Sequence, residues 1–465
     1  MSSSEVKWLR PVTLTEELTE LGHRNRMYLT CYTLHLASCQ PLHHDLVYSA
    51  LTHLFRKVEV LRVCLGQRDG QLWLRQMNGC NLDFKIVEQR KTEEVEEELT
   101  RYIYNTSEGP MWCVRLLGLP PTPSSTDLDS IFSHNYALMF GIHHSLADGF
   151  TNINICNLVH TILDDMVAGR PVNDEQQVGK LVGDEQTQKL YEEQRQKLLG
   201  DPELKERVRK EFQDGADTRP LFLDAFPVSG RTDVKTCFVN IQFDKNLTYS
   251  FRRKCKEEGV TLHSGLVGVI NATLINLLDD HCELPHEINF RAGHDVNLRR
   301  YYEGDTTGIY GNHVPTFGFR TSFKTSENLM SNFWPIVKEF HKKLHSHLSE
   351  GRPLQVVALK LMEKSKSEIL DGYFTSQGMP DSYYTVSNLG DVTPLFTGEG
   401  DCVKVVKLTR LSSIRCMNSF ICFFAHSLNG RLDLTMGFSN RFLDHKFAKE
   451  FMDMMSVNMT TLSPA

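Results

Sequence analysis

Two adjacent histidines, followed by an aspartate and a glycine, are the residues whose types and spacing could do chemistry. They are His143, His144, Asp148 and Gly149, and they directly follow the apolar stretch 136–142. Acyl transfer needs a base that removes a proton from a hydroxyl, amine or thiol as that group attacks an acyl carbonyl. An imidazole suits this task because its pKa lies near physiological pH. We expect a strand end to hold the imidazole rigidly, and the glycine to allow a tight turn and a close approach of substrate.

A metal site is the main chemical alternative for two histidines and one carboxylate. Adjacent residues on an extended chain point to opposite faces, so His143 and His144 cannot readily bind the same ion. The 12 cysteines are scattered, with no Cys-x-x-Cys pair and no metal-like spacing. We therefore expect no metal. The similar run His43-His44-Asp45 opens an amphipathic helix and lacks the glycine, so we interpret it as a solvated helix start.

The elements that must position these residues alternate between helix and strand along the first half of the chain. Apolar residues at helical or strand spacing predict a helix over 46–58, strands over 61–65, 71–75, 112–117 and 136–142, and a helix after Gly149. In the second half the same signals predict strands over 237–241, 288–290 and 313–316, helices over 247–258, 261–278, 333–348, 354–369 and 444–455, and a hairpin turn at Asn429-Gly430.

The predicted fold class is α/β, with the chain divided into two halves. We place the first half at residues 1–175 and the second at 220–465. The segment 176–219 is highly charged and poor in large apolar residues, so we predict that it is a linker or crossover between the halves.

The composition of the chain restricts which binding partners and which cellular compartment are expected. The formal net charge is -7 and the pI is about 6.3, which gives no reason to expect a nucleic-acid partner. The N-terminal residues lack the apolar stretch of a signal peptide. The apolar stretch 266–278 is shorter than the roughly 18 residues needed to cross a bilayer, so no transmembrane segment is predicted. We expect a cytoplasmic protein with reduced thiols.

The run His-His-x-x-x-Asp-Gly resembles the signature of the chloramphenicol acetyltransferase-like superfamily of CoA-dependent acyltransferases. That superfamily includes peptide-synthetase condensation domains, alcohol acetyltransferases, polyketide-associated acyltransferases and the plant BAHD enzymes. Further stretches that look like its segments are 46–62, 255–262, 295–300, 310–312, 387–390 and 429–432. The resemblance implies two chloramphenicol acetyltransferase-like α/β halves with an active-site tunnel between them.

The resemblance also assigns roles to residues of the motif. It implies that His144 is the general base; we interpret His143 as a supporting, structural residue. It implies that Asp148 points away from the substrate and pairs with Arg299, holding the loop in shape. Arg300 is the alternative cation for this pairing.

Two residues of a later strand complete the site that the resemblance implies. Ser387 and Asn388 look like part of the strand that lines the tunnel in alcohol acetyltransferases, near the developing oxyanion. The alternative is that both are turn residues at a strand end. The BAHD motif Asp-Phe-Gly-Trp-Gly is absent, and no carrier-protein domain follows, which disfavours the plant branch and a peptide-synthetase module.

The function expected from this pattern is transfer of an acyl group from acyl-CoA to a hydroxyl, with an amine as the second choice of acceptor. Acyl-CoA is a co-substrate in this interpretation, and no permanently bound cofactor is expected. Two alternatives stay open. One is a non-catalytic member that binds an acyl thioester or lipid. The other is a condensation-type partner of a separate acyl-carrier protein, although a net acidic chain offers no obvious basic docking face.

Overall fold

The chain forms two compact α/β units that are built from interleaved segments. The computed structural model describes residues 6–120, 131–181, 183–213, 220–228, 233–325, 329–375, 380, 382–415 and 419–463. The N-terminal residues 1–5, used above for the signal-peptide prediction, and 214–219 of the predicted linker lie outside the described residues. Unit 1 comprises residues 1–184, 302–313 and 391–413, and unit 2 comprises 185–301, 314–390 and 414–465.

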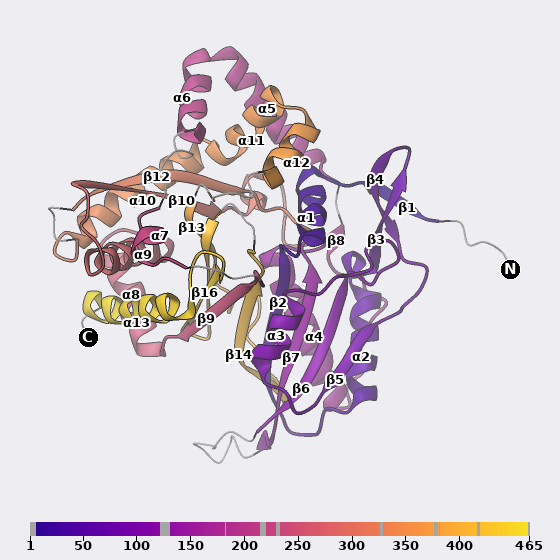
Figure 1. Cartoon of the computed structure of the whole chain (residues 1–465). Helices are drawn as coiled ribbons and strands as arrows, with labels where there is room; N and C mark the ends of the chain where they lie inside the picture. Colours follow the sequence, from indigo (N-terminus) through magenta and orange to yellow (C-terminus); the bar gives the residue numbers. More distant parts are fainter. Residues whose placement is uncertain are drawn as a thin grey trace. The chain divides into compact units, whose positions relative to one another are not determined.

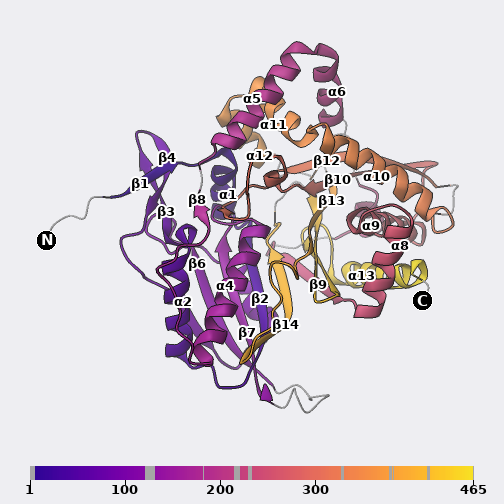
Figure 2. The same cartoon turned by 180° about the vertical axis from the view of Figure 1, so that it is seen from behind.

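Unit 1 is organised around a five-stranded sheet with the order β14-β2-β7-β6-β5. Its central strand β7 pairs antiparallel with β2 and with β6 along its whole length, and β5 pairs parallel with β6. In Figures 1 and 2, α4 covers one face of this sheet and α3 the opposite face. The strands of the sheet are β2 (Leu29–Ser38), β5 (Asp83–Val87), β6 (Trp112–Leu119), β7 (His134–His143) and β14 (Val403–Ser412).

The remaining elements of unit 1 are helices and two small sheets. A three-stranded sheet has the order β1-β4-β3, and β8 pairs with β11. The elements are β1 (Trp8–Pro11), β3 (Val63–Arg68), β4 (Gln71–Gln76), β8 (Lys180–Leu181), β11 (Ile309–Tyr310), α1 (Leu14–Arg24), α2 (His44–Lys57), η1 (Glu59–Arg62), α3 (Thr92–Leu99) and α4 (Gly149–Val167).

Unit 2 has a six-stranded sheet with the order β12-β10-β13-β15-β16-β9. The pairs β10–β12, β15–β16 and β16–β9 are antiparallel, and the pair β10–β13 is parallel. A large core of phenylalanine, leucine and methionine side chains fills the space between this sheet and its helices. The strands are β9 (Thr236–Gln242), β10 (Glu287–Asp295), β12 (Thr316–Lys324), β13 (Ser382–Asp391), β15 (Ser419–Leu428) and β16 (Arg431–Ser439).

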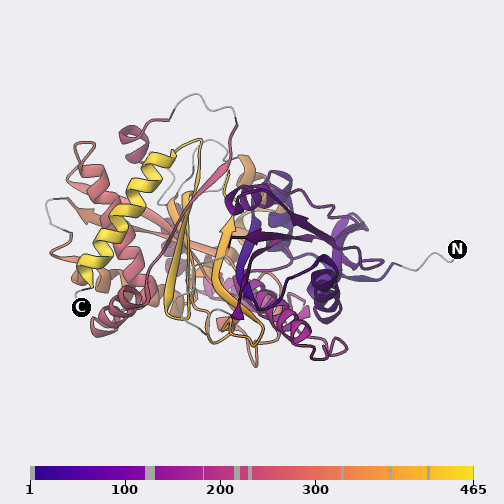
Figure 3. The same ribbon diagram turned by 90° about the horizontal axis from the view of Figure 1, so that it is seen from below.

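The helices of unit 2 form two groups. The C-terminal helix α13 packs against α9, α8 and β9, and Figure 3 shows it in yellow beside the strands of its sheet. A smaller apolar cluster of Leu198, Val208, Ala358 and Leu359 joins α5, α6 and α11. The helices are α5 (Glu185–Gly200), α6 (Pro202–Gln213), α7 (Phe222–Ala225), α8 (Lys245–Glu257), α9 (Leu262–Asp279), η3 (Leu298–Tyr301), α10 (Phe333–Ser349), α11 (Arg352–Glu363), α12 (Lys366–Thr375) and α13 (His445–Leu462).

The predicted fold class is confirmed, and three details differ from the sequence prediction. The segments 302–313 and 391–413 come late in the sequence but belong to unit 1, where β14 extends the main sheet beside β2. The predicted strand over 313–316 begins at Thr316, because the backbone of His313 bonds elsewhere. The predicted helix over 354–369 is two helices, since Lys364 adopts an extended backbone between them.

One helix among the described residues, α9, is long and apolar enough to cross a membrane by length and composition. It covers the apolar stretch 266–278, and the whole helix is longer than that stretch. In the structure, 72% of it is buried inside the protein, as expected for a core helix. Thr261 caps its N-terminus by accepting the N–H of Ser264.

Candidate active site of unit 1

The motif forms the connection between the central strand of unit 1 and its longest helix. His143 ends β7, with its N–H bonded to the carbonyl of Met111, and the chain turns sharply so that Leu146 N–H bonds back to the His143 carbonyl. His143 is fully buried, whereas His144 is half-buried. Gly149 is the first residue of α4 and therefore has a helical backbone, so the turn does not depend on a positive φ at this glycine.

Asp148 is fully buried and caps the N-terminus of α4. Its Oδ1 accepts the N–H of Thr151 at 2.9 Å, and its Oδ2 accepts the N–H of His313 at 3.0 Å. Its own N–H donates to the carbonyl of Gly311 at 3.1 Å, and the Thr151 hydroxyl donates to the same carbonyl at 3.0 Å. Gly311 has a φ of 132°, which glycine adopts far more readily than other residues. The returning segment 311–313 is thus tied to the motif by several hydrogen bonds.

Asn312, in the middle of that segment, contacts His144 itself. Its Nδ2 donates to the backbone carbonyl of His144 at 3.0 Å and lies 3.3 Å from the ring Nδ1. The amide is 7% exposed, and its Oδ1 has no hydrogen-bond partner among the described residues. On the other side, the ring of Tyr28 meets the His144 ring edge to face, with centroids 6.2 Å apart. The position of His144 is therefore set by contacts from two separate segments of unit 1.

The ring of His143 is held by a buried carboxylate, that of Glu20 in α1. Its Nε2 lies 3.1 Å from Oε2 of Glu20 in α1, and His23 Nδ1 lies 3.5 Å from the same oxygen. The other oxygen, Oε1, accepts Arg24 Nε at 2.9 Å and the Thr106 hydroxyl at 3.3 Å. We call Glu20, His23 and His143 the carboxylate cage.

The charge states in the carboxylate cage follow from these contacts. Burial favours a protonated carboxyl, but the hydrogen bond from His143 and the nearby His23 ring outweigh it and hold the pKa of Glu20 well below its usual range. Burial lowers the pKa of His143 to about 4, although the bond to Glu20 acts in the opposite direction. At neutral pH the cage therefore holds an anion and a neutral His143 imidazole.

The carboxylate cage also contains a set of possible metal ligands, with atoms of Glu20, His23 and His143 within 4.8 Å of one another. A ligating nitrogen must direct a lone pair at the ion. However, the Tyr104 N–H donates to His23 Nε2 at 3.0 Å, and the Ser145 N–H donates to His143 Nδ1 at 3.1 Å. Each accepting nitrogen holds its ring's lone pair, so the ring protons face Glu20. This arrangement suits a hydrogen-bonded carboxylate better than a metal ion.

The other predicted site residues belong to unit 2. Arg299 is buried in η3, where its backbone N–H and its guanidinium donate to Asn297 Oδ1 at 3.1 and 3.2 Å. Arg300 is exposed, and its guanidinium lies 5.6 Å from the centre of the Tyr301 ring. The pairing of Asp148 with either arginine stays a prediction.

Ser387 and Asn388 lie in β13 and are half-buried. The Oδ1 atom of Asn388 accepts the N–H of Gly390 at 2.8 Å, where the chain bends with a φ of +71°. Because Oδ1 accepts this bond, the Nδ2 donor of Asn388 points away from the bend at Gly390. Donors are what an oxyanion requires, so the Ser387 hydroxyl and Asn388 Nδ2 are the atoms on which the predicted role depends.

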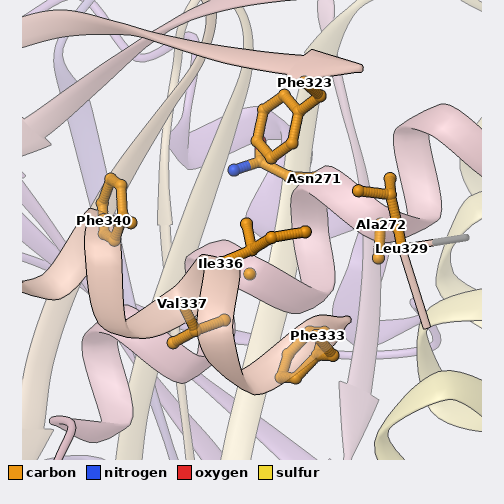
Figure 4. Close-up of a pocket in the computed structure, with 9 residues that line it drawn as sticks. Asn271, Ala272, Phe323, Leu329, Phe333, Ile336, Val337 and Phe340 are labelled. Atoms are coloured by element: carbon orange, nitrogen blue, oxygen red, sulfur yellow. The ribbon is translucent and has the colours of Figure 1, made fainter. Parts of the chain in front are cut away.

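A pocket in unit 2 has a different chemical character. Figure 4 shows it between α9, α10 and β12, lined by phenylalanine and aliphatic side chains with the Asn271 amide as its polar group. The Oδ1 of Asn271 accepts the Tyr384 hydroxyl at 2.6 Å. No lining residue can act as an acid, base or nucleophile, so the pocket does not compete with the motif as a reaction centre. Its lining is Gly268, Asn271, Ala272, Phe323, Leu329, Phe333, Ile336, Val337 and Phe340.

Sequence reasoning missed the residues that hold the two histidines in place. Glu20 and His23 are spaced three apart on α1 and so share a helical face, which is a weak signal without a known partner. Tyr28 has a φ of 56°, which sequence alone does not reveal. The run Tyr310-Gly311-Asn312 resembles a family segment, but the resemblance gives no role to Asn312.

Comparison with known proteins places the fold. No family model and no curated protein matches the sequence. The chain is similar in structure to trichothecene 15-O-acetyltransferase from Fusarium sporotrichioides, with a TM-score of 0.70 and 12% identity over 100% of this chain and 96% of that one. It is also similar to the condensation domain of the monacolin K polyketide synthase, with a TM-score of 0.65 and 12% identity over 99% of each chain.

A third similar structure is polyketide synthase associated protein 5 from Mycobacterium tuberculosis, with a TM-score of 0.64 and 14% identity over 99% of each chain. At these identities the likeness concerns the fold, which extends over the whole chain. The chain therefore has the two-unit α/β fold of acetyltransferases and condensation domains, the chloramphenicol acetyltransferase-like fold expected from its sequence.

Proposed function

We propose that the protein is an acyltransferase that moves an acyl group from acyl-CoA to a hydroxyl, with His144 as the general base. The observation that carries the proposal is the placement of His144. It is a half-buried imidazole at a strand end, contacted by Asn312 and Tyr28, in a loop anchored on both sides by buried His143 and Asp148. General-base catalysis depends on such fixed geometry.

Because Asn312 already contacts Nδ1, we propose that the other ring nitrogen, Nε2, takes the proton of the substrate. A neutral ring that accepts a proton at Nε2 must carry its existing proton on Nδ1. The amide nitrogen and oxygen of an asparagine are not distinguished by shape. A half-turn of the Asn312 amide would place its unpartnered Oδ1 near Nδ1, where it accepts that proton. The turn gives up the bond to the His144 carbonyl and brings Oδ1 towards that carbonyl oxygen, so it requires the two oxygens to move apart.

In the proposed reaction, Nε2 removes the proton of the hydroxyl as its oxygen attacks the thioester carbonyl. The tetrahedral intermediate then expels the CoA thiolate, which takes the proton back from the imidazolium and leaves as free CoA. Ser387 and Asn388 are proposed as donors to the oxyanion. Asp148 holds the loop, with Arg299 as its proposed cation. Acyl-CoA is the co-substrate, no permanently bound cofactor is proposed, and the proposed compartment is the cytoplasm.

A condensation-type reaction is the second candidate, since the fold is also that of condensation domains. In that case an acyl-carrier protein would replace CoA and an amine could replace the hydroxyl. A third possibility, binding of an acyl thioester without turnover, would leave the placement of His144 without a purpose.

The test is incubation of the purified protein with a panel of acyl-CoA thioesters and a small-molecule extract. Mass spectrometry identifies acylated products, and a thiol reagent measures the release of CoA. Products that form with the wild type and not with the His144→Ala variant support the proposal. Turnover only with acyl-carrier thioesters would favour the second candidate, and binding without product would favour the third.

The proposed mechanism uses no metal ion, so activity is expected to survive exhaustive chelation. Chelation with EDTA followed by the same CoA-release assay checks this point. Loss of activity that zinc or iron restores would contradict it and would redirect attention to the carboxylate cage.

A further inference from the structure

Two free cysteines oppose each other at one end of the main sheet of unit 1. Cys39 directly follows β2 and Cys402 directly precedes β14, although they are far apart in the sequence. The last pair in the strand register is Ser38 with Val403, so Cys39 and Cys402 are the next pair. The Cys39 N–H donates to the Cys402 carbonyl at 2.9 Å, which shows that the antiparallel pairing continues through them.

This placement meets the geometric demands of a disulfide. Directly opposed residues of antiparallel strands direct their side chains to the same face, with Cα atoms about 4.5–5.5 Å apart. Disulfides join residues whose Cα atoms are about 4.4–6.8 Å apart. Burial, and after it the neighbouring Cys39 thiol, raise the pKa of Cys402, which agrees with the closeness of the two side chains.

Access distinguishes this pair from most other described cysteines. Cys39 and Cys402 are both half-buried, so a small oxidant can reach them. Seven described cysteines are buried: Cys31, Cys64, Cys113, Cys156, Cys237, Cys255 and Cys422. Cys80 is exposed, and Cys282 belongs to unit 2.

We propose that Cys39 and Cys402 form a reversible disulfide that fastens β14 to β2, with glutathione disulfide as the oxidant. One thiolate attacks a sulfur of glutathione disulfide, which gives a mixed disulfide and releases one glutathione thiolate. The second thiolate then attacks the protein sulfur of the mixed disulfide and releases the second glutathione. The protein loses two thiol protons and two electrons, and one glutathione disulfide becomes two glutathione molecules.

The disulfide would act on a strand that leads towards His144. Near Cys402, Asp164 of α4 accepts the N–H groups of Cys402 and Val403 at 2.7 and 2.8 Å. Beyond the other end of β14, the Ser413 carbonyl accepts the N–H of Tyr28 at 3.0 Å, and the Tyr28 ring contacts His144. A cross-link at Cys402 would therefore limit opening of β14 and support the backbone that positions Tyr28.

The test is oxidation of the full-length protein in glutathione buffers of graded ratio. Free thiols are then alkylated, and peptide mass spectrometry locates the cross-link. We expect a Cys39–Cys402 peptide pair that dithiothreitol separates. Hydrogen exchange in β14 should slow by about tenfold or more on oxidation, because the cross-link opposes local opening.

Matched variants make each outcome decisive. Cys80→Ser should leave both the cross-link and the slowed exchange intact. Cys39→Ser should abolish both and leave Cys402 able to form only a glutathione adduct. Separate glutathione adducts on the two wild-type cysteines, cross-links to other cysteines, or a Cys39–Cys402 cross-link without slower exchange would each overturn the proposal. These measurements need no enzymatic activity, so they are independent of the proposed function.

Discussion

Each unit buries a histidine that is hydrogen-bonded to a second titratable side chain, and the two pairs differ in charge. In unit 1, His143 faces the Glu20 carboxylate at 3.1 Å, with Arg24 and Thr106 on the far oxygen. In unit 2, His263 Nε2 lies 3.1 Å from His294 Nδ1, and the Phe319 and Phe340 rings lie 5.3 and 5.7 Å from the His294 ring.

The difference shows what each pair can do for its surroundings. A charge-assisted bond to a carboxylate is stronger and more directional than a bond between neutral rings. The carboxylate cage can therefore fix the loop that carries His144, the proposed base. The His263–His294 pair is held mainly by packing, and burial lowers the pKa of His263 to about 4 and that of His294 well below its usual value. We expect the cage to support function and the unit 2 pair to be dispensable.

The largest effect is expected from removing His144, the proposed base. His144→Ala should lower the rate of acyl transfer by about 10²–10⁴-fold, the usual contribution of a general base. Stability should change little, because His144 is half-buried and is not one of the buried residues. CoA release and urea unfolding measure the two effects. The exposed His286 provides the control His286→Ala, and full activity in His144→Ala would refute the mechanism.

The next effect is expected from removing the charge of the carboxylate cage. Glu20→Gln keeps the shape but replaces an anion that accepts several hydrogen bonds, which should cost about 2–3 kcal/mol of unfolding free energy. It should also lower activity by loosening the His143–His144 loop. Urea unfolding and CoA release are the measurements, and Glu88→Gln on the surface is the matched control. If Glu20→Gln behaves like Glu88→Gln, the cage does not support the loop.

The pH dependence of the wild type follows from the same groups. The folded pKa of Glu20 lies below 4.5, so the stability it contributes is complete above that value and is lost as pH falls through the lower folded pKa. His143 has a folded pKa of about 4 and an ordinary value of 6.5, so the unfolded chain takes up its proton first as pH falls. Stability should therefore decline from about pH 6.5 towards pH 4.

A smaller and more specific effect is expected at the other end of the motif. Asp148→Ala removes the cap of α4 and the acceptor of the His313 N–H, which should cost roughly 1–2 kcal/mol from the cap alone. If Arg299 pairs with Asp148, the double variant should be much less damaged than the sum of the single ones. Urea unfolding of the four proteins gives the coupling energy. Simple additivity would exclude Arg299, and the cycle with Arg300→Ala would follow.

Local signals predicted much of the fold. The hairpin turn at Asn429-Gly430 has φ values of 49° and 77°, as its dipeptide indicates, and Gly259 ends α8 with a φ of 72°. Periodic apolar residues located most helices and strands. These features depend on neighbours in the sequence, which is why they could be predicted from it.

Long-range contacts could not be predicted in the same way. Glu20 lies 123 positions from His143, and Asn312 lies 168 positions from His144. The predicted division into two consecutive halves also gave no reason to place 302–313 and 391–413 in unit 1. Such partners are brought together by tertiary packing. A glutamate on a helix or an asparagine after a glycine does not indicate, from its neighbours in the sequence, which residue it will contact.

The smallest effect is expected in the unit 2 pair, and it should change with pH. His294→Phe removes a bond to His263, but it also removes a buried Nε2 that has no hydrogen-bond partner among the described residues, in surroundings that already contain Phe319 and Phe340. At pH 7 these changes should offset each other to within about 1.5 kcal/mol of unfolding free energy.

Below pH 6.5 the unfolded wild type gains a proton that folded His294 resists, whereas phenylalanine does not titrate. The unfolding free energy of the variant should therefore rise relative to that of the wild type as pH falls from 7 to 5. Urea unfolding at both pH values measures this difference. If the difference between the two proteins is the same at pH 7 and pH 5, His294 does not stay neutral in the folded protein, and the contrast between the two units fails.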